Sequence, residues 1–192
     1  MDWSLSHNFV LSANLHGGAV VASYPFDDSP LHRVSGYYSS SPDDSTFLYL
    51  AQTYANAHGT MSRGVKCNPS DNFPGGVTNG AEWYVAEGVM QDFNYHFSNC
   101  MEITLELSCC KRMPSRFLQH EWENNEQALL AYVEAAQTGL RGIVMYSNGQ
   151  PVEGARVEVQ GIDKHVKTTD RGEYWRLLYH RSYNNPNPRF YR

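Results

Sequence analysis

The sequence has few charged residues and no long apolar run. Lysine and arginine number 15 against 20 aspartates and glutamates, so charged residues make up 18% of the 192 residues and the formal net charge is −5. This composition gives no indication of a basic face for nucleic acid or of a polybasic membrane anchor. No stretch approaches the roughly 20 apolar residues of a membrane-spanning helix. Residues 1–4 have neither the basic start nor the apolar core of a signal peptide.

Cysteine is also scarce, and its spacing excludes two common motifs. The sequence contains Cys67, Cys100, Cys109 and Cys110, and none of them forms the CxxC pattern of a zinc knuckle or a thioredoxin-like site. A disulfide between Cys67 and one of the other three would indicate an oxidising compartment. Four buried thiols would indicate a cytosolic chain, and composition alone leaves both alternatives open.

The sequence does have a composition that can form a core, with 41% hydrophobic and 13% aromatic residues. Residues 9–15 are an apolar-rich run that ends in His16-Gly17-Gly18, and residues 19–23 contain further β-branched residues. We predict a buried strand, a tight turn and more extended chain. His16 then lies at a strand end, where α/β proteins commonly place ligands and catalytic groups.

Two helices are predicted further along the chain. A helix begins near residues 41–44 with Asp43 or Ser41 as its cap, and its apolar face consists of Phe47, Leu50, Ala51, Tyr54 and Ala55. Residues 117–136 predict a long amphipathic helix that closes the first domain.

Residues 59–80 are rich in glycine, proline, asparagine and serine, which predicts a long ordered loop. Residues 103–107 predict a second buried strand. Glu106 within this strand and Glu102 just before it are exceptions to its apolar character, and a buried carboxylate needs a compensating interaction. After Gly139, short strand-like segments alternate with turns such as Asn148-Gly149, which predicts a small all-β module.

Four blocks of sequence carry a resemblance to a known family. They are FVLSANLHGGAVVASYPFDD at 9–28, YSSSPDDSTFLYLAQTYANAH at 38–58, NFPGGVTNGAEWY at 72–84 and MQDFNYHFSNCMEITLELSCCK at 90–111. They resemble the N/E (regulatory) group of zinc metallocarboxypeptidases. Within that group the blocks are most similar to carboxypeptidases M and D. The similarity extends to about Leu178.

The resemblance implies an α/β fold in three segments. Residues 1–138 are similar to the C-terminal half of the mixed-sheet catalytic domain of peptidase M14 type. Residues 139–178 resemble part of the group's transthyretin-like β domain, and residues 179–192 form a divergent tail that we expect to be disordered. The implied protein is a monomer of the secretory pathway or extracellular space, although the chain itself shows no signal peptide.

The implied activity is zinc-dependent removal of C-terminal arginine or lysine from peptides and proteins. By resemblance, His16 in the LHGG turn is the third protein ligand of Zn²⁺, through a neutral imidazole nitrogen. Glu106 in ITLEL is similarly the general base, which takes a proton from the attacking water and passes it to the leaving amine.

Three further positions match substrate-binding residues of the family. Tyr84 has the spacing from Glu106 of the mobile tyrosine that closes over the terminal carboxylate of the substrate. Asp27 matches the acidic residue that binds a basic side chain through charge-assisted hydrogen bonds, and Gln91 matches a neighbouring polar contact. Without the resemblance, Asp27 in YPFDDSP would be interpreted as a turn residue.

One part of the family pattern is missing. The first two zinc ligands of the family lie in an HxxE motif before the LHGG turn, with an Asn/Arg carboxylate clamp between that motif and the turn, and this sequence has neither. We therefore expect a truncated chain with an incomplete zinc site, and the alternative function is a non-catalytic fragment or a peptide-binding decoy. A literal HxxE at residues 120–123 lies on the predicted amphipathic helix, where we interpret it as solvated surface.

Overall fold

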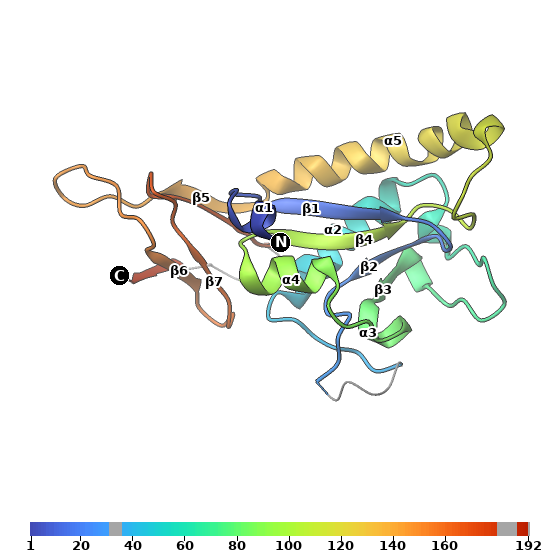
Figure 1. Cartoon of the computed structure of the whole chain (residues 1–192), viewed down its shortest axis with the longest axis horizontal. Helices are drawn as coiled ribbons and strands as arrows, with labels where there is room; N and C mark the ends of the chain where they lie inside the picture. The colour runs from blue at the N-terminus through green and yellow to red at the C-terminus, as the bar shows by residue number, and fades with distance from the viewer. Residues whose placement is uncertain (31–35, 180–187, 192) are drawn as a thin grey trace.

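The larger part of the chain forms a mixed α/β structure, and a smaller all-β part follows it (Figure 1). The computed structural model describes residues 1–30, 36–179 and 188–191. The larger part contains α1 (Asp2–Leu5), β1 (Leu11–His16), β2 (Val21–Tyr24), α2 (Asp44–Ala57), β3 (Val77–Asn79), α3 (Gly80–Trp83), α4 (Met90–Phe97), β4 (Met101–Glu106) and α5 (Leu118–Glu134). None of its described helices has the length and apolar character that crossing a bilayer requires.

The sheet of this part has the strand order β1-β4-β2-β3. β1 is parallel to β4, β2 is antiparallel to β4, and β2 is parallel to β3. The predicted strand, turn and extended segment are therefore present, but β4 lies between β1 and β2. The prediction that the first strand is buried is wrong, because β1 lies at the edge of the sheet that the described residues form and Leu15 is 52% exposed.

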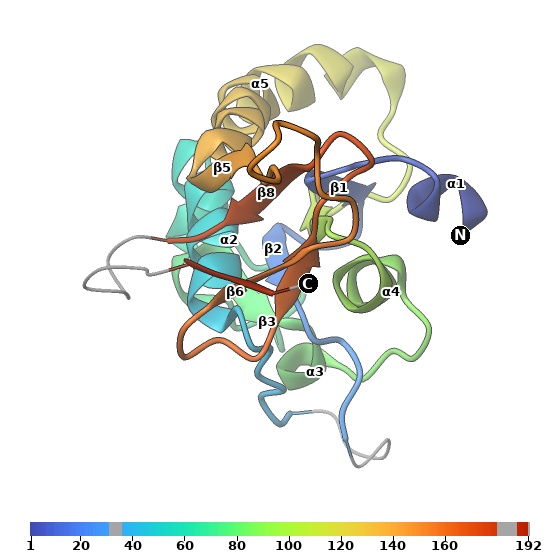
Figure 2. The same cartoon turned by 90° about the vertical axis from the view of Figure 1, so that its left-hand side faces the viewer.

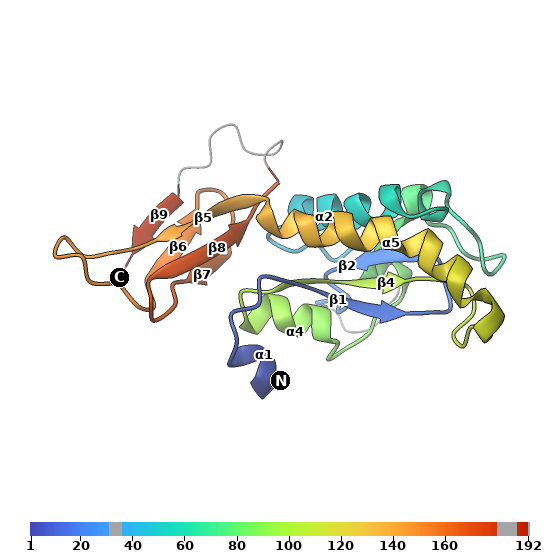
Figure 3. The same cartoon turned by 90° about the horizontal axis from the view of Figure 1, so that it is seen from above.

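The register of β1 and β4 separates polar from apolar side chains. Ser12 pairs with Glu102, Asn14 with Thr104 and His16 with Glu106. Because successive side chains of a strand point to opposite faces, these polar pairs share one face, and the buried Ile103 and Leu105 occupy the other. Figure 3 shows α2 and α5 on one side of the sheet and α4 on the opposite side.

Both predicted helices of the larger part are present. The apolar face of α2 is buried as predicted, from Phe47 to Ala55. Asp43 occupies the N-cap position, although its side chain makes no capping hydrogen bond. In α5, Ala128 and Tyr132 are buried, whereas Leu118 and Trp122 are more than half exposed and border an open groove of about 590 Å³. Only the second half of α5 therefore covers the core.

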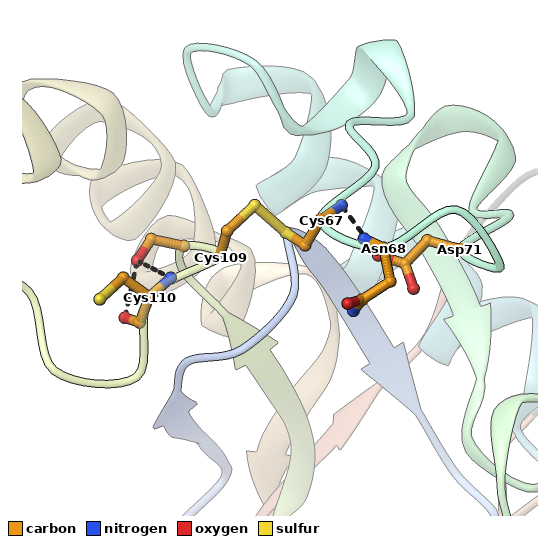
Figure 4. Close-up of a disulfide and its surroundings, with 6 residues drawn as sticks. Cys67, Asn68, Asp71, Cys109 and Cys110 are labelled. Carbon is orange, nitrogen blue, oxygen red and sulfur yellow. Dashed lines mark hydrogen bonds between the residues drawn. A yellow bond between two sulfur atoms is a disulfide. The ribbon is translucent and has the colours of Figure 1, made fainter.

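The loop predicted at residues 59–80 is largely irregular, with 3-10 turns at Met61–Arg63 and Pro74–Gly76 and the short strand β3 at its end. A disulfide joins Cys67 in this loop to Cys109 beyond β4 (Figure 4). The Asp71 carboxylate accepts hydrogen bonds from the backbone N–H groups of Cys67 and Asn68, both at 2.9 Å. Cys100 is a buried free thiol and Cys110 an exposed one, so the structure decides between the pairings that the sequence left open.

The part that follows is all β, as the sequence pattern predicted. It contains β5 (Gly139–Ile143), β6 (Arg156–Val159), β7 (His165–Lys167), β8 (Glu173–Leu177) and β9 (Pro188–Tyr191). β5 pairs with β8, and a second sheet has the order β7-β6-β9. The tail was expected to be disordered, but β9 pairs with β6 along its length. Residues 180–187 and 192 of that tail lie outside the described residues.

A buried ion pair joins the two parts, which lie end to end in Figure 1 and one behind the other in Figure 2. Arg176 of β8 donates to Asp43 at 2.8 Å, and both side chains are at most 2% exposed. The Tyr95 hydroxyl donates to the second oxygen of Asp43 at 2.9 Å. Lys164 donates to the carbonyl oxygen of Tyr95 and lies 4.7 Å from the centre of its ring.

Candidate active site

A small cavity of about 110 Å³ brings together all of the residues that the sequence singled out. His16, Asp27, Tyr84, Gln91 and Glu106 line it. They come from the end of β1, the segment after β2, the segment after α3, helix α4 and the end of β4. β1 and β4 are parallel, so their carboxyl ends meet at one edge of the sheet, where open α/β sheets place their ligands.

His16 and Glu106 face each other across the last pair of this register. Nδ1 of His16 lies 2.8 Å from Oε1 of Glu106. Glu106 is 4% exposed, and its second oxygen has no hydrogen-bond partner within the described residues, whereas His16 is half-exposed. A buried carboxylate with one free oxygen beside an accessible imidazole can accept a proton from a bound water molecule.

The backbone of Asp27 is hydrogen-bonded to the carboxylate of another residue, Asp92. Asp92 of α4 accepts the backbone N–H groups of Asp27, at 3.1 Å, and of Asp28, at 2.9 Å. Burial, followed by repulsion from Asp92, raises the pKa of Asp27 to about 8. Gly80 makes this placement possible, because a Cβ atom added there would overlap Oδ1 of Asp27. A cationic ligand would stabilise the ionised form of Asp27 and lower its pKa again.

Gln91 is fully buried, and its oxygen accepts a hydrogen bond of 2.7 Å from the Thr104 hydroxyl. The amide nitrogen of Gln91 has no partner among the described residues. A basic side chain requires an acceptor, so Gln91 would bind one only after its amide rotates by half a turn. The Thr104 hydroxyl could then accept from the amide nitrogen, because a hydroxyl both donates and accepts.

Tyr84 follows α3 in an extended conformation and is half-exposed at the mouth of the cavity. Burial, followed by the charges of Glu106 and Asp27, raises the pKa of its hydroxyl. The hydroxyl therefore stays protonated at neutral pH and can donate a hydrogen bond to an anionic group.

Sequence reasoning missed several residues of this site, among them Asn14, Gly80, Asp92 and Thr104. Two of them had a recognisable signal. Asn14 and Thr104 belong to the alternating polar positions of β1 and β4, and that alternation identifies the face from which His16 and Glu106 also project.

The described residues do not complete a zinc site. His16 offers a suitable nitrogen, but no group of three or more histidine, cysteine, aspartate and glutamate side chains converges anywhere in the described ranges. The literal HxxE is no substitute, because His120 and Glu123 are exposed on α5 and His120 contacts Asn124. Zinc sites in proteins use three or four protein ligands, so His16 fits the metal as one ligand of a set that these residues leave incomplete.

Comparison with known proteins decides the family. The family model described as zinc carboxypeptidase matches residues 1–128. The chain belongs to the zinc carboxypeptidase family. Carboxypeptidase D of Rattus norvegicus is 50% identical over 188 residues, which cover 96% of this chain and 14% of that protein. Carboxypeptidase D of Drosophila melanogaster is 50% identical over 179 residues, with 93% and 13% covered.

The catalytic chain of carboxypeptidase N from Homo sapiens is 49% identical over 180 residues, which cover 92% of this chain and 39% of that protein. This zinc carboxypeptidase chain therefore spans well under half the length of these relatives. The predicted resemblance is confirmed at the level of the family.

Proposed function

We propose that this chain supplies part of the catalytic site of a zinc carboxypeptidase that removes C-terminal arginine or lysine from peptides and proteins. The observation that carries the proposal is the convergence of His16, Glu106, Tyr84 and Asp27 in one cavity. Family membership supports the class of reaction, and the buried carboxylate of Asp27 supports the preference for a basic terminal residue.

Each residue has a role in this proposal. Glu106 accepts the proton of the attacking water with its free oxygen and later returns it to the leaving amine. Tyr84 donates its hydroxyl hydrogen to the terminal carboxylate of the substrate. Asp27 forms a charge-assisted hydrogen bond with the basic side chain, and Gln91 lies beside it.

His16 is proposed to be one nitrogen ligand of Zn²⁺, with the remaining ligands supplied from outside the residues that the structure describes. We also propose that β5 to β9 form part of a transthyretin-like domain and that the protein acts in the secretory pathway or outside the cell as a monomer. The Cys67–Cys109 disulfide supports an oxidising compartment.

Hydrolysis of a dansylated peptide ending in arginine tests the proposal. The chain alone should be inactive with added zinc, and a fusion that places before it a segment carrying the HxxE motif of the family should be active. Glu106→Gln in the fusion should abolish turnover and leave zinc bound. Turnover by the chain alone, or activity that survives Glu106→Gln, would contradict the assigned roles.

Specificity is tested separately in the same fusion. Asp27→Ala should lose most of the preference for arginine over a neutral terminal residue, by about tenfold or more, because a hydrogen bond to a charged group is lost. Glu87→Ala is a matched control, since Glu87 is a nearby carboxylate that does not line the cavity.

The second candidate function is a peptide-binding decoy. The incomplete cluster of metal ligands within the described residues favours it, and the Asp27 cavity does not depend on zinc. Two measurements together distinguish the candidates. The decoy would be supported if calorimetry shows that the chain alone binds a C-terminal arginine peptide without hydrolysing it, and if the fusion with the HxxE segment is also inactive.

A further inference from the structure

The segment that carries the proposed specificity residue Asp27 contacts helix α4 in both of its turns. In the first turn, the carboxylate of Asp92 accepts the backbone N–H groups of Asp27, at 3.1 Å, and of Asp28, at 2.9 Å. In the last turn, the ring of His96 is stacked on the ring of Phe26, with centroids 4.8 Å apart. The position of the Asp27 carboxylate therefore depends on where α4 lies.

Two cations of the β part hold the last turn of this helix. Lys164, in the connection between β6 and β7, donates to the carbonyl oxygen of Tyr95 and lies 3.4 Å from that of His96. Its ammonium nitrogen is also 4.7 Å from the centre of the Tyr95 ring. Arg176 acts through Asp43, whose carboxylate accepts from Arg176 at 2.8 Å and from the Tyr95 hydroxyl at 2.9 Å. A cation is favourable at this end of a helix, because the last carbonyl groups lack partners within the helix and carry partial negative charge.

The residue that the β part holds lies on the same face of α4 as the residues that serve the active-site cavity. Side chains three and four positions apart share a face of a helix, so Gln91 and Asp92 are on the face of Tyr95. All three are buried. A shift of α4 that followed the loss of the Tyr95 contacts would therefore move Gln91 and Asp92 with it. It would also reach the neighbour of Asp27 directly, since the Tyr95 and Phe26 rings are 5.7 Å apart.

We propose that Lys164 is a positioning residue for substrate selectivity, which holds the last turn of α4 and thereby fixes, through Asp92, the place of the Asp27 carboxylate. The inference rests on the proposed role of Asp27 and extends that role to the β part. Lys164 is the better of the two cations to change, because its hydrogen bonds go to uncharged carbonyl oxygens. Its removal leaves the Asp43 carboxylate paired with Arg176.

Hydrogen exchange in the whole chain tests the positioning role without reference to activity. Lys164→Met keeps the length of the side chain and removes its ammonium group. The backbone N–H groups of Asp27 and Asp28 should then exchange about tenfold faster, because their bonds to Asp92 open more often. The N–H of Leu107, which is bonded to the end of β1, should keep its rate. Unchanged exchange at Asp27 and Asp28, or an equal acceleration at Leu107, would overturn the proposal.

Lys167→Met is the matched control for the exchange experiment. Lys167 is an exposed lysine at the end of β7, so this change removes one positive charge from the same β part and leaves the last turn of α4 in place. An acceleration equal to that in Lys164→Met would contradict a specific role of Lys164. Lys164→Gln keeps a donor at this position and keeps the proposal testable if Lys164→Met does not fold. It should give a smaller acceleration at the same two N–H groups, and no acceleration would overturn the proposal.

Selectivity is measured in the fusion that carries the HxxE segment, with peptides that end in arginine or in leucine. Lys164→Met should lower the ratio of kcat/KM for arginine over leucine by about fivefold, mainly through KM for the arginine peptide. In an Asp27→Asn background the same change should leave the ratio as it is, because the carboxylate that Lys164 positions is gone.

The two possible failures are distinguishable. If Asp27→Asn by itself leaves the ratio unchanged, the proposed function of Asp27 is wrong, and the exchange rates at Asp27 and Asp28 still decide the positioning role. If Lys164→Met lowers the ratio equally with and without the Asp27 carboxylate, the positioning role is wrong and the proposed function stands.

Discussion

At the scale of single residues, the active-site cavity depends on a glycine. Gly80 begins α3 directly against the Asp27 carboxylate, and an added Cβ atom would overlap Oδ1. Asp27, the residue that is proposed to select the substrate, can therefore occupy its position only because residue 80 has no side chain.

Gly80→Ala should displace Asp27 and weaken binding of a C-terminal arginine peptide by about tenfold. The measurement is peptide affinity by calorimetry in the wild type and the variant. The matched control is the same change in an Asp27→Ala background, where its effect should be smaller because the carboxylate is gone. Equal effects in both backgrounds would show that Gly80 acts on something other than Asp27.

The raised pKa of Asp27 predicts how stability changes with pH. Its pKa is about 8 in the folded chain, against 3.8 as its ordinary value. Between these values the folded state holds a proton that the unfolded state has released, so the free energy of unfolding should fall as pH rises from about 4 to about 8. Urea unfolding of Asp27→Asn should lack this contribution. Identical pH profiles for the wild type and the variant would contradict the raised pKa.

At the scale of elements, the pairing of β1 with β4 decides which residues meet. His16 and Glu106 are ninety positions apart in the chain and lie opposite each other in the register. A slip of one residue would turn every side chain of β1 to the other face. The Gly17-Gly18 turn and the bond from the N–H of Gly18 to the Ser108 carbonyl, at 2.8 Å, secure the end of this register.

The disulfide between Cys67 and Cys109 acts on the same region. Cys109→Ser should lower the free energy of unfolding by about 2–5 kcal/mol, because the unfolded chain loses a cross-link. Cys110→Ser is a matched control in the neighbouring residue, and it should change stability little since Cys110 is an exposed free thiol. Chemical unfolding under non-reducing conditions provides the comparison, and equal losses in the two variants would mean that the pairing is different.

At the scale of the whole molecule, charged groups join the α/β part to the β part. Asp43 precedes α2 and forms an ion pair with Arg176 of β8, and the Tyr95 hydroxyl of α4 donates to the same Asp43 carboxylate. α4 also carries Gln91 and Asp92, so the β part contacts the helix that supports the proposed specificity residue Asp27.

Arg176→Met should destabilise the chain by about 3–5 kcal/mol, because the Asp43 carboxylate would be left buried without its cation. Adding Asp43→Asn to that variant should recover part of the loss. Arg171→Met is the control, since the Arg171–Glu173 pair is 75% exposed on its arginine side and should matter by less than about 1 kcal/mol. Thermal unfolding of the variants measures these differences, and equal effects of Arg176→Met and Arg171→Met would exclude a stabilising ion pair between the parts.

Local patterns were sufficient for several features. The apolar spacing of α2, the buried run of β4 and the turn-rich β part were all predicted correctly, because each depends on neighbours within a few residues. The family could also be identified from ordered blocks of sequence. The roles of His16, Glu106, Tyr84, Asp27 and Gln91 stay predictions, although these residues do line one cavity.

The tertiary structure alone decided which distant groups meet. It placed β1 at the edge of the described sheet and paired Cys67 with Cys109. It also paired the Asp43 side chain with Arg176, so that Asp43 makes no side-chain capping bond although it occupies the N-cap of α2. Periodicity reports which face of an element is apolar, but the partner of a buried polar group depends on contacts between segments far apart in the chain. The sequence by itself therefore determined the family and the elements, and the packing of those elements determined the electrostatic surroundings of the site.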